Sequence, residues 1–352
     1  MRYESEAPLV SVVVPCRNEK AHIENCLRSI LAQEDVPGGF EVIVADGLSE
    51  DGTVALVKKI GRTDKRLRIV QNPARLTACG LNEGIRQARG RFIAVMGAHN
   101  LYAPDYLRSS LEVLLETGAD NVGGSMLSRG ESRMQKAIAI AHHSRFSVGG
   151  ARWHDISYEG PADTVFGGFY RREVFERLGL FDETLVRNQD DEFNLRLLRA
   201  AGKIWQSPRI RSWYRPRAHL SALGRQYLQY GYWKVRVIQK HRMPASWRHL
   251  VPGSFVFLLT VLPFLTPLFL GALWIWLGLI GLYVAANLLV SITTAVRHGP
   301  EYLLYYLPPV FACYHFGYGI GFLCGIVDFV ILHRQPTLAF TGLTRPSAPE
   351  RI

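Results

Sequence analysis

Short apolar runs alternate with segments of helical period over the first hundred residues of the chain. The runs at 10–14, 42–45, 67–71 and 92–96 are continuous and rich in β-branched residues, which suits strands that are buried on both faces. Apolar positions at helical spacing lie between these runs, as at 21–31, 53–60 and 81–88. Strands that alternate with helices predict an α/β fold with a mostly parallel, mixed sheet.

The pattern is less regular after Tyr102. Helices are expected over residues 104–115 and 190–200, and the glycine pairs at 123–124 and 167–168 mark strand ends where backbones approach closely. Residues 221–240 again have a helical period, with aromatic side chains among basic ones. That mixture suits a helix lying in a membrane interface, and the alternative is a surface helix packed on a soluble domain.

An uncharged tract dominates the last third of the chain. Residues 252–296 contain no Asp, Glu, Lys or Arg. A spanning helix needs about 20 apolar residues, so the tract has room for two, with a hinge near 267–271. A third apolar stretch at 310–332 carries His315 and Asp328, which are costly in lipid. A large buried helical core is the alternative, although so long an uncharged tract exceeds ordinary core helices.

These patterns divide the chain into four predicted regions. They are an α/β domain at 1–220, an interface helix region at 221–250, a transmembrane region of two to three helices at 251–335, and a C-terminal tail at 336–352. The first eight residues are polar and acidic, unlike a signal peptide. We therefore expect the N-terminal domain to remain cytoplasmic and the protein to be a multi-pass protein of the inner membrane.

The charge of the chain supports a membrane partner. The formal net charge is +11, and basic residues gather just before the apolar tract, at positions 225, 234, 236, 240, 242 and 248. Basic residues beside spanning helices favour the cytoplasmic side and attract anionic headgroups. Because no nucleic-acid-binding motif accompanies the charge, we expect a membrane and not a nucleic acid as the partner.

Four polar clusters lie where predicted strands end. They are Pro15–Glu19, Asp46–Asp51, Gly97–Asn100 and Asn188–Glu192. Ligands of open α/β sheets bind at the carboxyl ends of the strands, so a carboxylate at a strand end is well placed to hold a polar ligand. The alternative for the second cluster is a helix cap formed by Ser49 or Asp51.

Together the four clusters resemble the family 2 glycosyltransferases, which have the GT-A fold, over roughly residues 10–240. The segments 190–196, 213–217 and 229–233 look further like the bacterial succinoglycan-type, membrane-anchored glucosyltransferase branch. The resemblance implies a nucleotide-sugar site lined by Pro15, Arg17, Glu19, Asp46, Asp51 and Asn82. An aspartate there accepts hydrogen bonds from a base or ribose, and a guanidinium suits phosphate.

The same resemblance implies a divalent metal and a catalytic base. Family members usually have an Asp where this chain has Gly97, so His99 is left as the candidate ligand for Mg²⁺ or Mn²⁺, or as a group that only hydrogen-bonds substrate. Alignment with the family makes Asp190 the base, with Asp191 as second choice and Gln189 in place of the usual Glu. Acidic residues also suit a helix N-terminus without any catalytic role.

The resemblance implies acceptor contacts from Arg196, Tyr232 and Trp233, although aromatic side chains at an interface often only anchor a protein. Residues 229–233 lack the Arg of the Gln-x-x-Arg-Trp signature of processive synthases, which favours transfer of a single sugar. We therefore expect an inverting transfer of glucose from a UDP-sugar to a polyprenyl-diphosphate-linked saccharide, for exopolysaccharide or another surface glycan, with other polysaccharide-assembly proteins as partners. The alternatives are a processive polysaccharide synthase and a catalytically silent nucleotide-sugar-binding scaffold subunit.

Overall fold

The structure is a computed structural model that describes residues 7–342 of the chain. Two compact units divide these residues. The first consists of residues 7–127 and 152–214, and the second of residues 128–151 and 215–342. Residues 128–151 belong to the second unit, where α5 packs against the C-terminal helices, and the domain bounds expected from the sequence stay a prediction.

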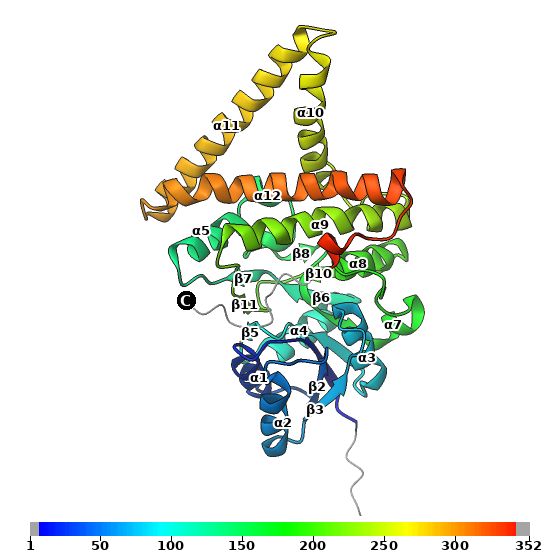
Figure 1. Ribbon diagram of the computed structural model, residues 1–352. Helices are drawn as coiled ribbons and strands as arrows, with labels where there is room; N and C mark the ends of the chain where they lie inside the picture. Colours follow the sequence, from blue (N-terminus) through cyan, green and yellow to red (C-terminus); the bar gives the residue numbers. More distant parts are fainter. Residues whose placement is uncertain (1–6, 343–352) are drawn as a thin grey trace, which may run out of the picture. The chain divides into compact units, whose positions relative to one another are not determined.

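Half of the first unit is a parallel α/β layer (Figure 1). Its strands β1 to β4 all run in parallel, with β1 between β2 and β4. The elements are β1 (Val10–Cys16), α1 (Ile23–Leu31), β2 (Phe40–Asp46), α2 (Thr53–Thr63), β3 (Leu67–Gln71), α3 (Thr77–Gln87) and β4 (Phe92–Val95). The register pairs Cys16 with Asp46, and Asp46 with Gln71, so the three strands end side by side.

The sheet continues in mixed directions, as the sequence predicts. Strand β9 (Phe166–Arg171) runs antiparallel to both β4 and β6 (Asn121–Gly124), and the full order is β3-β2-β1-β4-β9-β6-β10-β8. The remaining elements are α4 (Tyr106–Thr117), η1 (Arg152–His154), β8 (Gly160–Pro161), α7 (Arg172–Leu178), α8 (Gln189–Arg199) and β10 (Ile204–Gln206). A small second sheet holds β5 (Leu101–Tyr102), β11 (Ser212–Tyr214) and β7 (Met126–Ser128).

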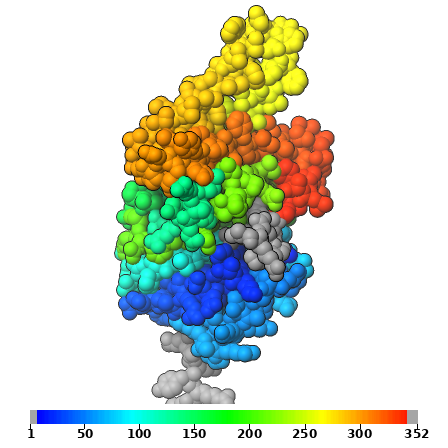
Figure 2. Space-filling view, turned by 60° about the vertical axis from the view of Figure 1, so that its left-hand side comes forward, coloured from blue at the N-terminus to red at the C-terminus, as the bar shows by residue number. Residues whose placement is uncertain are grey.

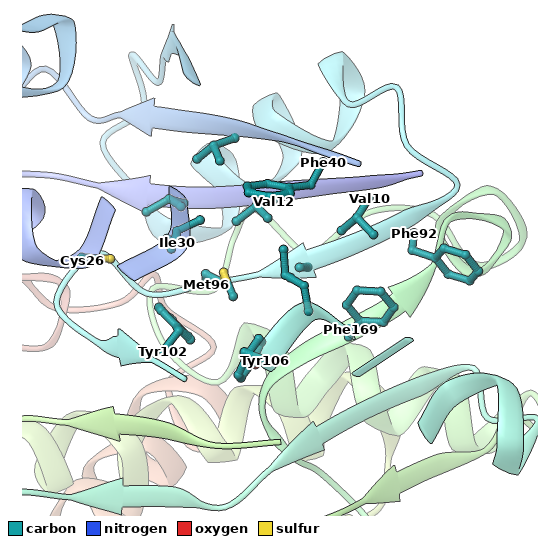
Figure 3. Close-up of a cluster of buried hydrophobic side chains, with 14 of the residues drawn as sticks. Val10, Val12, Cys26, Ile30, Phe40, Phe92, Met96, Tyr102, Tyr106 and Phe169 are labelled. Atoms are coloured by element: carbon teal, nitrogen blue, oxygen red, sulfur yellow. The ribbon is translucent and has the colours of Figure 1, made fainter. Parts of the chain in front are cut away.

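Apolar side chains cover both faces of the large sheet. On one face Val10, Val12 and Phe40 from the strands meet Ile30 of α1 and Tyr106 of α4 (Figure 3). On the other face Val13 and Ile43 meet α3, α7 and α8. Neighbouring strand residues such as Val12 and Val13 are both fully buried. This double burial explains why the strands read as continuous apolar runs without alternation.

The second unit is entirely helical in the described residues outside β7. Its elements are α5 (Arg133–His142), α6 (Arg145–Val148), α9 (Leu220–His241), η2 (Trp247–His249), α10 (Val251–Leu265), α11 (Gly271–His298), α12 (Leu303–Gly325), the π-helical turn η3 (Ile326–Ile331) and α13 (Leu338–Thr341). Three helical stretches have the length and composition to cross a membrane: Trp247–Leu265, Gly271–His298 and Leu303–Ile331. The predicted hinge at 267–271 lies between α10 and α11.

Helices α9 and α12 lie side by side and run in the same direction (Figure 1). Glycines bring their backbones together: a Cβ added at Gly317 would lie 3.1 Å from the Gly224 carbonyl oxygen, and one at Gly325 would lie 2.7 Å from that of Tyr232. Between these points the same hypothetical atom on Gly321 would overlap the Leu228 carbonyl. Only glycine allows this approach, as in the small-residue contacts of membrane helices.

Candidate active site

The carboxyl edge of the parallel strands gathers three of the four predicted polar clusters. Because β1 lies between β2 and β4, the chain connections diverge at β1, and such a switch point is where open α/β sheets bind ligands. Residues 15–19 span the end of β1 and the loop after it, residues 46–51 begin at the last residue of β2, and residues 97–100 follow β4. Pro15, near the end of β1, pairs with Ala45 at this edge.

The loops after β1 and β2 are tied together by hydrogen bonds. The Asn18 backbone N–H donates to the Ser49 hydroxyl (2.8 Å), and the Glu50 N–H donates to the Asn18 side-chain oxygen (2.9 Å). Asn18 and Leu48 both have positive φ angles, of 52° and 56°. Such backbone conformations are uncommon outside glycine and often occur at functional sites. The sequence pattern identified the two loops but not these contacts between them.

Asp51 shapes this pair of loops. One carboxylate oxygen accepts from the Thr53 backbone and hydroxyl (3.0 and 2.5 Å), and the other accepts from the Lys20 N–H (2.9 Å). Burial raises the pKa of the carboxyl, but the bonds from Thr53 and Lys20 outweigh it and leave the pKa below its usual value. Asp51 therefore holds the turn before α2, although the N-cap of that helix is Gly52 and not Asp51 or Ser49. The contact of Asp51 with the nucleotide stays a prediction.

Only one of the two carboxylate oxygens of Asp46 accepts a hydrogen bond from the described residues. Its Oδ2 accepts from the Ser49 N–H at 2.9 Å, whereas its Oδ1 is buried and has no hydrogen-bond partner among the described residues. A buried carboxylate oxygen without a partner is unusual. The buried Nε of Arg17 is likewise without a partner in the described part of the chain. These two groups offer an acceptor and a donor at the end of the sheet, as expected for a site that binds a polar ligand.

Glu19 and His99 meet across the switch point. Glu19 Oε1 lies 3.3 Å from Nδ1 of His99, and the Glu19 side chain is almost entirely buried. The His99 ring packs edge-on against Tyr214 of β11, with centroids 5.7 Å apart, and Tyr214 in turn packs against Phe166 of β9. The sequence predicted Glu19 and His99 separately, and it gave no individual role to Tyr214 beyond its place in a matching segment.

The backbone at Gly97 lies close to the Asn100 side chain. A Cβ there would lie 2.7 Å from the side-chain nitrogen of Asn100, which is itself buried. The Gly97 N–H donates to the Tyr102 hydroxyl at 2.6 Å, which fixes the backbone of this turn. A side chain at position 97 would therefore require the Asn100 amide to move.

Asp190 stands in the first turn of α8. The helix begins after Asn188, whose φ of 62° turns the chain sharply, and the Asp191 N–H donates to Asp190 Oδ1 at 3.0 Å. Asp190 is exposed and Asp191 is partly exposed. Below them, Asn194 binds the Asn121 and Thr164 side chains at 3.0 and 2.9 Å, so the start of α8 is held against the sheet.

The side chains of Arg196 and Asn82 form hydrogen bonds to other groups of the protein. Arg196 pairs with the fully buried Glu192 at 2.9 Å and donates to the carbonyl oxygens of Leu178 and Leu180, both at 2.7 Å. Asn82 accepts from the Phe181 N–H at 3.0 Å and donates to the Phe181 carbonyl at 2.9 Å. Both side chains position α8 or the loop before it, and their predicted contacts with substrate stay predictions.

Tyr232 and Trp233 are buried in the second unit, at 0% and 1% exposure. The Tyr232 ring stacks on Phe340 with centroids 3.9 Å apart, and its hydroxyl donates to Asp328 at 2.7 Å. Trp233 Nε1 donates to the Phe340 carbonyl at 3.0 Å. Neither ring presents a face to an acceptor sugar in this arrangement, so the predicted acceptor role would require the packing to rearrange.

The donor atoms for a metal are limited. Among residues 7–342 no group of three or more His, Cys, Asp or Glu side chains is arranged to hold a metal ion. Glu19 and His99 nevertheless supply a carboxylate and an imidazole in contact. A metal-binding histidine typically donates its other ring N–H to a carboxylate, and Mg²⁺ sites commonly combine few protein ligands with substrate phosphates. The pair therefore fits a metal that also binds a diphosphate.

Comparisons with known proteins find similarity to glycosyltransferases. Residues 11–179 match the family model described as Glycosyl transferase family 2. The chain is 32% identical to "Succinoglycan biosynthesis protein ExoA" of Rhizobium meliloti over 243 residues, which cover 68% of this chain and 73% of the relative. It is 26% identical to a "Dolichyl N-acetyl-alpha-D-glucosaminyl phosphate 3-beta-D-2,3-diacetamido-2,3-dideoxy-beta-D-glucuronosyltransferase" of Methanococcus voltae, over 90% of this chain and 97% of the relative.

A solved structure has a similar fold. The mannosyltransferase PcManGT of Pyrobaculum calidifontis, solved with GDP-Man and Mn²⁺, matches with a TM-score of 0.54 at 19% sequence identity. The match covers 88% of this chain and 86% of that chain. At 19% identity the similarity supports the fold alone. It agrees with the mixed α/β sheet predicted from the sequence.

Proposed function

This chain belongs to the family 2 glycosyltransferases, and on that premise we propose that it transfers one glucose from UDP-glucose to a polyprenyl-diphosphate-linked saccharide. The reaction would take place at the cytoplasmic face of the inner membrane and serve exopolysaccharide or surface-glycan synthesis. The relatives support this context, since one is named for succinoglycan biosynthesis and another for a dolichyl-phosphate-linked acceptor.

The unpartnered Oδ1 of Asp46 is the observation that carries the donor assignment. No donor from residues 7–342 bonds to this oxygen, and a uracil N–H or a ribose hydroxyl would supply one. Arg17, at the same edge, offers a guanidinium N–H to the diphosphate. Asp51 fixes the loop that carries this site through its bonds to Thr53 and Lys20.

His99 is the proposed metal ligand, and Glu19 its orienting partner. The Glu19 carboxylate oxygen lies 3.3 Å from Nδ1 of His99, where it would orient the imidazole ring for a cation. A nitrogen ligand favours Mn²⁺ over Mg²⁺. A bound metal would neutralise charge on the diphosphate leaving group.

Asp190 is the proposed general base. The acceptor hydroxyl gives its proton to the Asp190 carboxylate while its oxygen attacks the anomeric carbon from the face opposite the diphosphate. The bond from that carbon to the diphosphate oxygen breaks, and the configuration inverts. The exposed position of Asp190 at the start of α8 gives an incoming hydroxyl access to it.

The test is release of UDP by the purified full-length protein in detergent, given UDP-sugars and a lipid-linked acceptor. Asp190→Asn should lower kcat by about 10²–10⁴-fold, the usual worth of general-base assistance. Asp191→Asn is the matched control next to it and should lower kcat much less. Equal loss in both variants would contradict the assignment of Asp190.

Two further measurements separate the remaining alternatives: the length of the product, and the rate of turnover with each of a set of UDP-sugars. A single added sugar is expected, whereas a ladder of products would show a processive synthase. Binding of a nucleotide sugar in calorimetry without any turnover would instead identify a silent scaffold subunit. Turnover with another UDP-sugar in preference to UDP-glucose would correct the donor.

A further inference from the structure

Helix α12 differs from the other two candidate spans. About 39% of its most apolar window is buried within the structure, against 17% for Trp247–Leu265 and 11% for Gly271–His298. The α10–α11 hairpin is lined with exposed apolar side chains such as Phe264, Leu268 and Leu282. In Figure 2 this hairpin, in yellow, projects away from α12, in orange and red.

The helix beside α12 carries too much charge to lie in hydrocarbon. Helix α9 contains Arg225, Lys234, Arg236 and Lys240. Such residues within a membrane segment are costly and rare. The two helices run in parallel from the Gly224–Gly317 contact to the Gln239 side chain, which donates to the Phe329 carbonyl at 2.7 Å. If α12 crossed the bilayer, α9 would have to cross with it.

A second charged helix covers the same side of α12. Helix α5 contributes Ala137, Ile138 and Ala141 to a buried cluster with Leu307 and Phe311 of α12. It also carries Arg133 and Lys136. Two helices with polar and charged side chains thus shield one side of α12.

The opposite side of α12 is apolar and exposed. In α12 Tyr305 is 80% exposed and Ile320 43%, and in the following turn η3 Val327 is 42% and Ile331 62% exposed. No charged side chain lies between Glu301 and Asp328, and Asp328 is buried. A helix with one apolar face, packed on charged helices, has the character of a helix lying in the interface between headgroups and acyl chains.

The chain after α12 turns back along α9. Asp328, in the π-helical turn, pairs with Arg334 at 2.6 Å. Farther on, the Gln229 side chain donates to the Gly342 carbonyl at 2.6 Å, and Trp233 contacts Phe340. The segment 334–342 therefore stays beside α9 and does not continue in the direction of a spanning helix.

We propose that the outer face of α12 is a lipid-contacting surface that lies in the plane of the membrane, and that the α10–α11 hairpin is the segment that enters the bilayer. The chain then returns to the side on which it left α9. This arrangement also places Arg334 on the same side as the basic residues of α9, as the positive-inside tendency favours. The proposal does not depend on the donor, acceptor or catalytic base.

Depth measurement tests the orientation of α12 directly. Single cysteines for spin labels would replace Tyr305, Ile320 and Val327 in the full-length protein, with Cys313 and Cys324 changed to Ala, in vesicles of anionic and zwitterionic phospholipids. An in-plane helix gives three depths within about one helical turn, ~5 Å. A spanning helix would separate the first and last labels by about 33 Å at 1.5 Å per residue, which would overturn the proposal.

Helix α11 supplies the matched control. Labels at Leu282, Leu289 and Val296, which are exposed and seven residues apart, should give graded depths in the same vesicles. Graded depths in α11 together with equal depths in α12 support the proposal. Equal depths in both helices would contradict it, because the hairpin would then not enter the bilayer.

Reporter fusions provide a second readout that does not depend on cysteine variants. Alkaline phosphatase, active only outside the cytoplasm, and a fluorescent protein that fluoresces only inside it would each be fused before Met1 and after Ile352. Both ends should report the same compartment. Opposite compartments would require an odd number of crossings and would overturn the proposal, even if UDP release is normal.

Discussion

The two aspartates that follow β2 have different tasks, although they stand only five positions apart. Asp46 keeps one buried oxygen without a partner in the described structure, and Asp51 gives both oxygens to the protein backbone and Thr53. The first is suited to bind a ligand and the second to hold a loop. Mutation of the two residues should therefore affect different measurements.

Asp46→Asn should weaken donor binding with little loss of stability. The variant retains a side-chain acceptor for the Ser49 N–H but replaces the other oxygen with a donor. We expect the KM for the nucleotide sugar to rise about 10- to 100-fold, which corresponds to about 1.5–3 kcal/mol for a hydrogen bond to a charged group. Asp51→Asn should chiefly lower the melting temperature. A reversed pattern in steady-state kinetics and thermal unfolding would contradict these roles.

Sequence alone predicted individual groups of the site better than their pairing. Asp46 could be predicted because a buried strand ends on it. The contact of Glu19 with His99 could not, since 80 positions separate them and only the order of β1 and β4 brings them together. The close contact of Gly97 with the Asn100 side chain was likewise not predictable from the sequence.

At the scale of elements, the apolar runs in the sequence predicted the positions of the strands closely. The helical periods predicted the first residues of the helices less accurately. The run at 67–71 coincides with β3, whereas the helix expected at 81 begins at Thr77. Its first turns contain Gly80 and Gly84, which disfavour a helix on propensity. Both allow α3 to approach the sheet closely: a Cβ at Gly80 would lie 2.8 Å from the Asn72 amide. Tertiary packing thus overrides local preference.

Residues 128–151 pack with the C-terminal helices, and no pattern in the sequence indicated this. Their one clear helix, α5, buries small residues such as Ala137 and Ala141. So short a helix with small apolar residues gives a weak signal in sequence. Its association with the C-terminal helices depends on a matching surface on α12, which local periodicity does not encode.

The glycine contact between α9 and α12 predicts how the helix pair responds to substitution. Gly321→Leu would place side-chain atoms against the Leu228 carbonyl and force the helices apart. We expect a loss of about 1–3 kcal/mol, typical of overpacking, measured as thermal unfolding in detergent. Gly281→Leu is the matched control in α11, because nothing lies within 4 Å of a Cβ there. Equal losses in the two variants would show that the α9–α12 contact contributes little.

At the scale of the whole molecule, a buried charge cluster makes stability depend on pH. Glu41 is 3% exposed and accepts from the Ser11 hydroxyl at 2.7 Å and the Arg89 N–H at 2.8 Å. Burial raises the pKa of Glu41, but the bonds from Ser11 and Arg89 outweigh it, so the pKa lies below the ordinary value of 4.5. Its contribution is complete above that value and is lost as the pH falls through the lower pKa of the folded state.

Glu41→Gln should reduce stability at pH 7 by about 1–3 kcal/mol, the cost of disrupting buried hydrogen bonds. It should also flatten the decline in melting temperature between pH 7 and pH 3. Glu24→Gln is the surface control, because Glu24 pairs with Arg28 on an exposed helix face and should change little. An unchanged pH profile in Glu41→Gln would contradict this account.

The turn between α10 and α11 has a consequence for how the protein is made. Residues 266–270 are Thr-Pro-Leu-Phe-Leu, and Leu268, Phe269 and Leu270 are more than half exposed. The backbone N–H groups of Leu268 and Phe269 both bond to the Leu265 carbonyl. During synthesis no charged loop has to be drawn through the bilayer between these two helices. In the proposed hairpin Arg297, near the end of α11, stays on the side from which the hairpin enters, so insertion moves no charged side chain across the bilayer.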